Sequence, residues 1–306
     1  MRSLPHLCLT LVALAGCSEY AYTERTVTDY WEQPAVESVA DVLFVVDNSA
    51  SMAEEQERLG ANFEAFVEVV TDSYADFRIG VITTDVAEAG ALRGEVLTPT
   101  TEDLASAFLE QVAVGTKGDK DEQGLATAVM AFSANPDFSR PEAQLNVAVI
   151  SDEDDHSPEA IDDYLNPLKD VSDVGFALHA VVGDLPDGCA SGTSAASPGE
   201  RYITAVDWTG GYRDSICSDD YTGILTRIGL DISGLSDTFA LSEVPEPETI
   251  TVWVDGVEIP GREMDGWRWE PGENVIVFDG YAVPRPGMEI VAEYQLLLGN
   301  EVDSGG

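Results

Sequence analysis

Apolar and polar positions alternate along this chain with two different periodic patterns. Between residues 39 and 237, short continuous apolar runs alternate with longer stretches in which apolar residues recur every three or four positions. The short runs predict strands buried on both faces, at residues 42–46, 77–83, 146–150 and 176–182. The longer stretches predict helices at residues 52–70, 104–111, 122–132, 158–169 and 220–230. Strands that alternate with helices imply an α/β fold, with a mostly parallel sheet covered by helices on both faces.

A second pattern of apolar and polar positions begins after residue 237. Apolar residues alternate with other types from Ile250 to Val254, Asp255-Gly256 is a hairpin signal, and short-strand periodicity continues to Tyr294. Residues 238–298 are therefore expected to form a small all-β module. The remaining residues, 299–306, are expected to be a flexible tail.

The N-terminus has the pattern of a targeting segment. Arg2 precedes the mostly apolar residues 4–15, a run that suits a signal peptide and is too short to span a bilayer. Residues 14–17 read LAGC, which resembles the bacterial lipobox. We therefore expect a lipoprotein signal peptide over residues 1–16, lipidation of Cys17, and a tether over residues 17–38. The alternative is an ordinary cleavable signal with a chance cysteine.

Two further observations bear on location. No later segment approaches about 18 uninterrupted apolar residues, so no transmembrane helix is expected. Ser18 rather than Asp follows the cysteine, a pattern that favours the outer membrane in lipoproteins of diderm bacteria. The expected location is the cell envelope, with a lipid anchor on an otherwise soluble chain.

Residues 184–217 interrupt the α/β alternation. The stretch is rich in Gly, Ser, Pro and Asp, and we expect an ordered insertion because structureless loops of this length are uncommon. Cys8 leaves with the signal and Cys17 carries lipid, so Cys189 and Cys217 remain in an oxidising setting and are expected to form a disulfide. A metal or redox pair is the alternative, but there is no Cys-x-x-Cys spacing and no histidine close by.

The charge of the chain is strongly one-sided. It has 15 Lys+Arg against 57 Asp+Glu, a formal net charge of −42. Such a field repels nucleic acid and anionic membrane surfaces and attracts cations or basic surfaces of a partner. The simpler interpretation is a solvated surface tuned for solubility or a salty habitat.

Candidate chemistry gathers where predicted strands end. Asp47, Ser49 and Ser51 directly follow the strand at residues 42–46, and ligand sites in open α/β sheets lie beyond the carboxyl ends of strands. Their oxygens are hard donors suited to Mg²⁺, Mn²⁺ or Ca²⁺. These groups are too few to hold an ion, so other loops must contribute. The candidates are Thr116, before a predicted helix, and Asp152, after a predicted strand.

This pattern resembles the metal-ion-dependent adhesion site (MIDAS) of the von Willebrand factor A (vWA) domain, built from Asp-x-Ser-x-Ser, a downstream Thr and a further Asp. The matching residues, in order over about residues 39–237, are Asp47, Ser49, Ser51, Thr116 and Asp152. The resemblance implies a Rossmann-like vWA domain that acts as a non-enzymatic adhesion module. It also implies a divalent ion, Mg²⁺ first and Mn²⁺ or Ca²⁺ otherwise. One coordination position would stay open for a carboxylate of a protein or glycan partner.

The chain departs from the family pattern at two places. Ala50 stands where the family usually has Gly, and would cost roughly 1 kcal/mol if that position needs positive φ. Asp152 is followed by Glu153, Asp154 and Asp155 instead of Gly. These three acidic residues are possible additional cation ligands, or they face solvent. They also make the approach of an acidic partner harder.

Several residues also have structural interpretations. Ser51 begins a Ser-x-x-Glu capping box and could simply cap the following helix. Thr116 could be a turn residue, with Thr84 as a poor substitute ligand. His156 is interpreted as a solvated loop residue and His179 as a packed strand residue.

Three functions follow from these observations. The first is metal-dependent adhesion by a lipid-anchored vWA protein. The second is a metal-stabilised structural scaffold of an envelope complex. The third is a metal-dependent hydrolase that uses Asp47 with Asp152, Asp154 and Asp155; it is disfavoured because the sequence shows no positioned general base and no basic residues for a phosphate substrate.

Overall fold

The computed structural model describes residues 25–34, 38–73, 75–118, 120–192, 194–263 and 265–296. The predicted signal peptide at residues 1–16, the predicted lipidation site Cys17 and the expected tail at residues 299–306 lie outside these ranges.

The central sheet is parallel, as the continuous apolar runs predicted. Its strands are β2 (Val39–Val46), β3 (Asp76–Thr83), β4 (Gln144–Ile150), β5 (Phe176–Val182) and β8 (Arg213–Ser215), in the order β3-β2-β4-β5-β8. β2 is buried along nearly its whole length because it lies between β3 and β4 and is covered on both faces.

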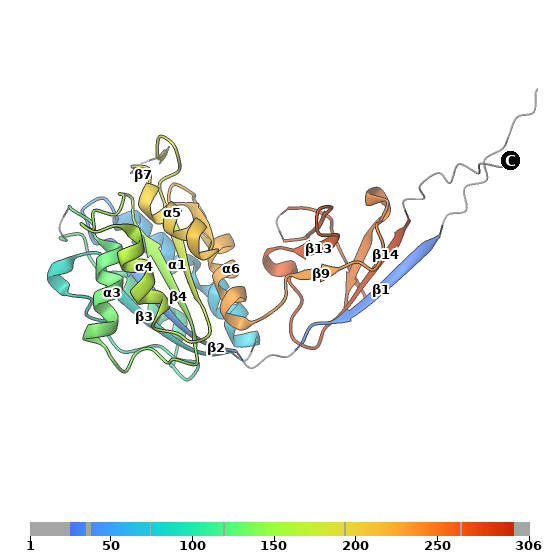
Figure 1. The fold of residues 1–306 in the computed structure, drawn as a ribbon, viewed down its shortest axis with the longest axis horizontal. Helices are drawn as coiled ribbons and strands as arrows, with labels where there is room; N and C mark the ends of the chain where they lie inside the picture. The colour runs from blue at the N-terminus through green and yellow to red at the C-terminus, as the bar shows by residue number, and fades with distance from the viewer. Residues whose placement is uncertain are drawn as a thin grey trace, which may run out of the picture.

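Helices cover both faces of this sheet (Figure 1). One face carries α1 (Ala53–Asp72), α2 (Leu104–Val112) and α6 (Thr222–Ser233), and the 3-10 turn η1 (Val86–Glu88) follows β3. The other face carries α3 (Gly124–Ala134), α4 (Ile161–Lys169) and α5 (Glu200–Thr209). On the first face Phe108 packs against Phe44 and Phe63, with ring centroids 4.8 and 3.4 Å away. The predicted helices are confirmed, although α3 and α6 start two residues later than expected and α4 starts three residues later.

The expected insertion at residues 184–217 is shorter than predicted. Only residues 184–198 leave the α/β alternation, as a small hairpin of β6 (Cys189–Ser191) and β7 (Ser194–Ala196). After it, α5 buries Tyr202 and Val206, and β8 adds the edge strand of the sheet. The sequence analysis missed β8 because this edge strand is short and polar and lacks an apolar run.

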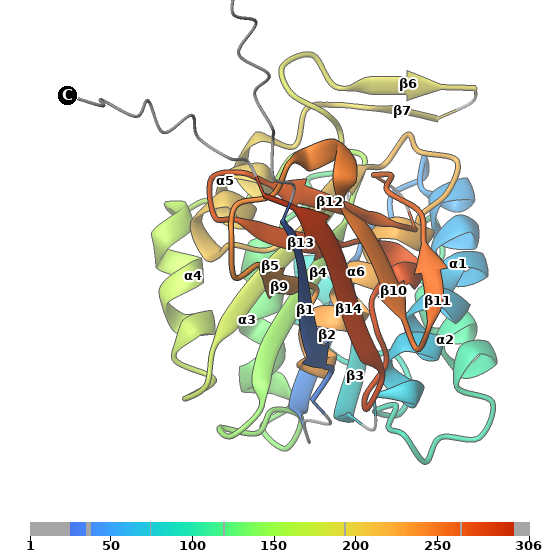
Figure 2. The ribbon, with the colours of Figure 1, turned by 90° about the vertical axis from the view of Figure 1, so that its right-hand side faces the viewer.

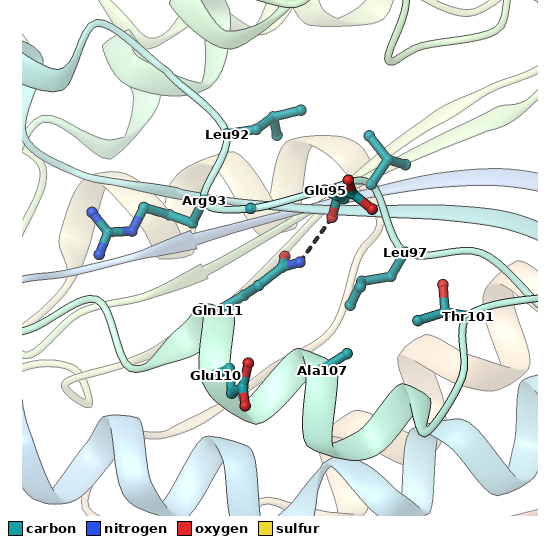
Figure 3. A pocket seen from close by; sticks show the side chains of 10 residues that line it. Leu92, Arg93, Glu95, Leu97, Thr101, Ala107, Glu110 and Gln111 are labelled. Carbon is teal, nitrogen blue, oxygen red and sulfur yellow. Dashed lines mark hydrogen bonds between the residues drawn. The ribbon is translucent and has the colours of Figure 1, made fainter.

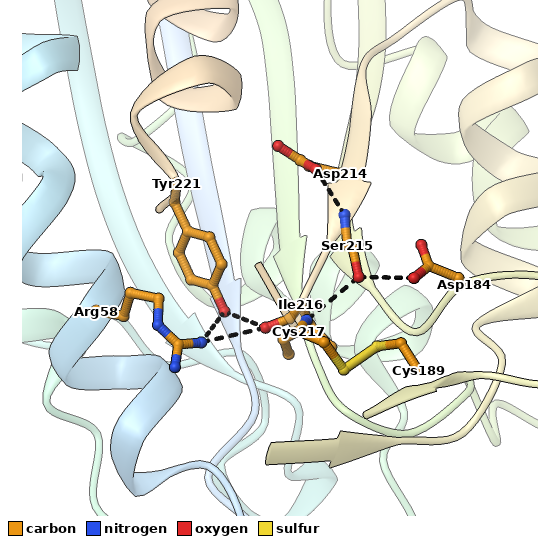
Figure 4. The surroundings of a disulfide bond; sticks show 8 residues. All are labelled: Arg58, Asp184, Cys189, Asp214, Ser215, Ile216, Cys217 and Tyr221. Carbon is orange, nitrogen blue, oxygen red and sulfur yellow. Dashed lines mark hydrogen bonds between the residues drawn. A yellow bond between two sulfur atoms is a disulfide. The ribbon is translucent and has the colours of Figure 1, made fainter. Parts of the chain in front are cut away.

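The predicted disulfide joins Cys189 to Cys217, with their Cα atoms 6.0 Å apart (Figure 4). The two cysteines are separated by 28 positions. Closing a loop of that length stabilises the fold by about 3–4 kcal/mol in the chain-entropy model. The disulfide therefore fixes the β6-β7 hairpin to the segment that follows β8.

The C-terminal module is all-β, as predicted. One sheet has the order β1-β14-β10-β11 and the other β12-β13-β9. The bounds are β1 (Thr26–Glu32), β9 (Thr238–Ala240), β10 (Thr251–Val254), β11 (Val257–Ile259), β12 (Trp267–Glu270), β13 (Val275–Phe278) and β14 (Glu289–Gln295), with 3-10 turns η2 (Pro247–Thr249) and η3 (Gly280–Ala282). The hairpin signal is confirmed: Asp255 and Gly256 have φ of 47° and 75° and connect β10 to β11.

The expected tether is wrong for residues 26–32, which form β1 of this module. β1 pairs antiparallel with β14 over its full length, from Thr26 opposite Gln295 to Glu32 opposite Glu289 (Figure 2). Val27 and Trp31 pack against the core of the module. The pairing was not predicted because the two strands lie at opposite ends of the sequence and β1 alternates only weakly.

The β module packs against the α/β domain at the end that lies away from the carboxyl edge of the sheet. Val69 near the end of α1 and Leu230 near the end of α6 belong to its hydrophobic core. Arg285 of the module pairs with Glu68 and Asp72 of α1 at 3.9 and 3.7 Å. Because α1 starts at the carboxyl edge and has 20 residues, its far end lies about 30 Å from that edge.

Gln33 connects β1 to the junction between the two bodies, and its replacement should destabilise the protein. The side chain is fully buried; its Nε2 donates to Ser236 O at 2.8 Å and Pro284 O at 3.0 Å, and Ser236 N donates to its Oε1. Gln33→Ala leaves these backbone groups unpaired and should cost about 1–3 kcal/mol in the free energy of unfolding. Denaturant titration measures this value, with exposed Glu32→Ala as the matched control. An unchanged free energy of unfolding for Gln33→Ala would contradict the conclusion that Gln33 ties β1 to this junction.

Candidate functional site

Asp47 lies at the centre of the carboxyl edge of the sheet. The preceding residue, Val46, pairs with Thr83 of β3 and Ile150 of β4, so Asp47 emerges between the ends of both strands. The Asp47 side chain is fully buried. Ser49 N donates to its Oδ1 and Ser151 Oγ donates to its Oδ2, both at 2.7 Å. The carboxylate is therefore held in one orientation at the point where three strands end.

Ser49 and Ser51 lie beside this carboxylate. Their hydroxyl oxygens are 3.2 Å apart, and the Ser51 hydroxyl hydrogen-bonds the Asp152 side chain. The capping interpretation of Ser51 is wrong, since Met52 is the cap residue of α1 and no side chain caps that helix. Ala50 is not among the described residues with positive φ, so it carries none of the strain considered for this position.

Asp152 follows β4 and belongs to the same cluster. It is only 6% exposed, and Ser197 N fixes its backbone by donating to Asp152 O at 2.9 Å. Burial, followed by the negative charge of Asp47, raises the pKa of Asp152 to about 6, although Ser51 opposes the shift. Within the described part of the chain, the buried Oδ1 of Asp152 has no hydrogen-bond partner. This oxygen is free to accept a cation.

Thr116 lies on a loop that is clamped against the Asp47 segment. Gln56 of α1 donates from Nε2 to both Asp47 O and Gly115 O at 2.9 Å, and Gly118 N donates to Asn48 O at 2.8 Å. Thr116 itself is half-buried. Among the described residues, its hydroxyl forms no hydrogen bond with the other four predicted ligands. The structure thus brings the loop to the site without pairing the Thr116 side chain.

Glu122 is a member of the cluster that the sequence analysis missed. It is 1% exposed, and its Oε2 accepts a short hydrogen bond from the hydroxyl of Thr84, which is fully buried beyond the end of β3. Burial, then the charges of Asp47, Glu153 and Asp152, raise the pKa of Glu122 to about 8. The signal was weak: Glu122 was assigned to the first turn of a helix, and one acidic residue among 57 Asp+Glu does not stand out.

Of the acidic run after Asp152, only Glu153 contributes its charge to the site. Asp154 Oδ1 accepts from Arg201 N at 2.9 Å. Asp155 is buried and accepts from Leu125 N at the start of α3, from Ser157 Oγ and from Arg201 Nε. Asp154 and Asp155 therefore hold α3 and α5 in place, whereas the charge of Glu153 raises the pKa values of Glu122 and Asp152.

Neither His156 nor His179 belongs to the site. His156 is exposed, and its backbone N donates to Glu122 O at 2.6 Å. His179 is packed as predicted: it is fully buried, its ring bonds Asn146 Oδ1, and Tyr212 N donates to its Nδ1. Burial lowers the pKa of His179 to about 3, so the ring is neutral.

A network of hydrogen bonds surrounds the disulfide (Figure 4). Arg58 of α1 donates to Tyr221 Oη at 3.1 Å and to Ile216 O at 3.2 Å, and Tyr221 also donates to Ile216 O. Ser215 Oγ donates to Asp184 Oδ2 at 2.7 Å. These bonds tie α1, the start of α6 and residues 184–198 together beside the site.

The cavity in Figure 3 does not coincide with this cluster. It has a volume of about 580 Å³ and lies between residues 92–97 and α2, where Gln111 Nε2 donates to Glu95 O at 2.8 Å. None of the predicted ligands lines it. We therefore place the candidate site at the carboxyl edge of the sheet.

The donor set of the cluster fits a hard divalent cation. Carboxylates of Asp47, Asp152 and Glu122 gather with the hydroxyls of Ser49 and Ser51, and one buried oxygen each of Asp152 and Glu122 lacks a hydrogen-bond partner in the described chain. The described residues contain no ready-made cage of three or more acidic, His or Cys side chains. An ion here would therefore need the serine hydroxyls and water as well as carboxylates.

No family model and no curated protein matches this sequence. Solved structures match in fold. The pilus adhesin SpaC from Lactobacillus rhamnosus GG matches with a TM-score of 0.50 and 11% identity, over 88% of this chain and 41% of that one. A von Willebrand factor type A protein from Catenulispora acidiphila matches with a TM-score of 0.41 and 13% identity, over 91% of this chain and 63% of that one.

A further match is proximal thread matrix protein 1 from the mussel byssus with a zinc occupied MIDAS motif, with a TM-score of 0.40 and 14% identity, over 68% of this chain and 47% of that one. This chain spans less than half the length of SpaC. At such identities these likenesses concern the fold alone. The chain has an α/β fold with a parallel sheet covered by helices on both faces, followed by a small all-β module, and it shares its fold with the SpaC structure.

Proposed function

We propose that this protein is a metal-dependent binding module of the cell envelope, in which a vWA domain presents a divalent cation to a protein or glycan partner. One observation carries the proposal: Asp47, Ser49, Ser51 and Asp152 meet at the carboxyl edge of the sheet, and the buried Oδ1 of Asp152 has no hydrogen-bond partner in the described chain. Leaving a buried carboxylate oxygen unpaired is costly, and a cation removes that cost.

Asp47 and Asp152 would supply negative charge to the ion, and Ser49 and Ser51 would supply hydroxyl oxygens. Thr116, on the loop clamped by Gln56, would contribute directly or through water. The bound ion supplies a Lewis-acidic position for an oxygen of the partner, which the family resemblance identifies as a carboxylate. Oxygen donors of this kind favour Mg²⁺, with Mn²⁺ or Ca²⁺ as alternatives.

We propose no catalytic role for the site. A hydrolase with two ions would need Asp154 and Asp155 as ligands. Both already accept hydrogen bonds from Arg201, and Asp155 also caps the start of α3. The strongly acidic chain would in addition repel phosphate esters.

The arrangement of the β module and the α/β domain is compatible with an anchored protein whose metal site faces away from its membrane. Among the described residues, none of the helices combines the length and the apolar character needed to cross a bilayer. We propose a lipid anchor on Cys17, in the outer membrane of a diderm bacterium. The chain would then enter the β module through β1, and the metal site would lie at the opposite end of the vWA domain (Figure 1).

Metal binding should stabilise the protein through Asp47. At a free metal concentration of 100 times Kd, a single site adds about 2.7 kcal/mol to the free energy of unfolding. We therefore expect Mg²⁺ or Mn²⁺ to raise the Tm of protein stripped with EDTA, and Asp47→Asn to abolish most of this rise because it removes the charge at nearly constant shape. Exposed Asp173→Asn, before β5, is the control. Equal metal-induced shifts in Asp47→Asn and wild type would contradict the site.

Partner capture should require both the ion and Asp47. Wild-type protein on beads with Mg²⁺ should retain an envelope component that is lost with EDTA and with Asp47→Ala, and mass spectrometry of the eluates measures this. If EDTA lowers Tm while capture persists, the ion is structural only and the scaffold alternative holds.

Lipidation should depend on Cys17. Metabolic labelling of expressing cells with an alkyne fatty acid should label wild type and Cys8→Ala, because Cys8 lies inside the predicted signal peptide. Cys17→Ala should lose the label and leave the membrane fraction. A Cys17→Ala protein that keeps the label would refute the anchor.

A further inference from the structure

Glu122 is fixed beside Asp47 by contacts on both sides. Val46 pairs with Thr83, so Thr84 is the residue that follows β3 next to Asp47. Thr84 donates its hydroxyl to Glu122 Oε2, and Gln123 N donates to Thr84 O at 3.2 Å. On the other side, His156 N donates to Glu122 O at 2.6 Å, which ties Glu122 to the loop after β4. Glu122 is thus held between the two loops that flank Asp47.

The second carboxyl oxygen of Glu122 lacks the hydrogen bond that a buried polar atom normally has. Glu122 is 1% exposed, and within the described chain its Oε1 is buried without a hydrogen-bond partner. Asp152 Oδ1 is in the same situation on the neighbouring loop, at 6% exposure. The charges of Asp47 and Asp152 act directly on Glu122. A shared cation would satisfy both of these unpaired oxygens.

We infer that Glu122 is a ligand of the cation at this site and occupies the coordination position that a partner's carboxylate would otherwise fill. This inference rests on the proposed function. When Glu122 is deprotonated, Asp47, Asp152 and Glu122 together offer three negative charges to a doubly charged ion, and Glu153 adds a fourth nearby. A further carboxylate from a partner is repelled unless Glu122 leaves. Glu122 therefore acts as an internal competitor that keeps the site closed until a partner displaces it.

A purely structural role makes a different prediction. If Glu122 only accepts the hydrogen bond from Thr84, an amide serves as well, because Gln retains the size and an acceptor oxygen. If Glu122 is a ligand, the amide removes a negative charge from the ion. Glu122→Gln therefore separates the two roles without leaving a cavity.

The test measures Mn²⁺ binding to purified protein by calorimetry and by the relaxation rate of water protons. We expect Glu122→Gln to bind Mn²⁺ at least about tenfold more weakly than wild type, the size of effect typical of perturbed metal sites. The Mn²⁺ complex of Glu122→Ala should relax water faster, since water enters the vacated position. Acetate should slow that relaxation in Glu122→Ala and leave wild type unchanged. Glu142→Gln, an exposed residue before β4, is the control.

The possible failures are distinguishable. If wild type and Glu142→Gln bind no Mn²⁺, the proposed function falls and the inference falls with it. If wild type binds Mn²⁺ while Glu122→Gln binds it equally well, and water relaxation is the same in Glu122→Ala, only the inference is overturned. Circular dichroism of each variant establishes that weak binding does not come from unfolding.

Discussion

The burial of several carboxylates at one edge of a parallel sheet is the constraint on which this structure depends. Asp47 emerges from the most enclosed strand of the sheet, so its charge cannot be shielded by water. Ser49 N and Ser151 Oγ each pair one of its oxygens, but hydrogen bonds do not neutralise the charge. Asp152 and Glu122 add two more buried carboxyl groups. A cation bound here would offset the repulsion among these like charges.

The surrounding elements serve to hold that cluster in place. Gln56 joins the Asp47 segment to the loop of Thr116, and Asp155 with Arg201 fixes the start of α3 to the loop after β4. The disulfide and the Arg58–Tyr221 contact hold residues 184–198 next to Asp152 O. Most of these contacts connect different loops. The geometry of the site is therefore a property of the assembled domain and not of any single segment.

The β module determines where the ends of the described chain lie relative to the candidate site. Both ends of the described chain meet in it, because β1 pairs with β14, and it contacts α1 and α6 through Val69, Leu230 and the ion pair of Arg227 with Asp279 (Figures 1 and 2). The carboxyl edge of the central sheet points the other way. An anchor before β1 would leave that edge exposed to partners, and the length of α1 sets the separation.

The sequence by itself determined the α/β core with its parallel sheet and half of the candidate site. Short continuous apolar runs that alternate with helical patterns indicate strands buried on both faces, and Asp47, Ser49 and Ser51 follow one such run within five residues, so the local pattern was sufficient for them. Asp152 followed from its place after a buried strand, and the disulfide from the count of cysteines. Only the tertiary structure decided that β1 completes the C-terminal module, that β8 extends the sheet, that Ser51 faces Asp152 instead of capping α1, and that Glu122 joins the cluster. Each of these depends on contacts between residues far apart in the chain, where the residue type alone does not reveal the partner.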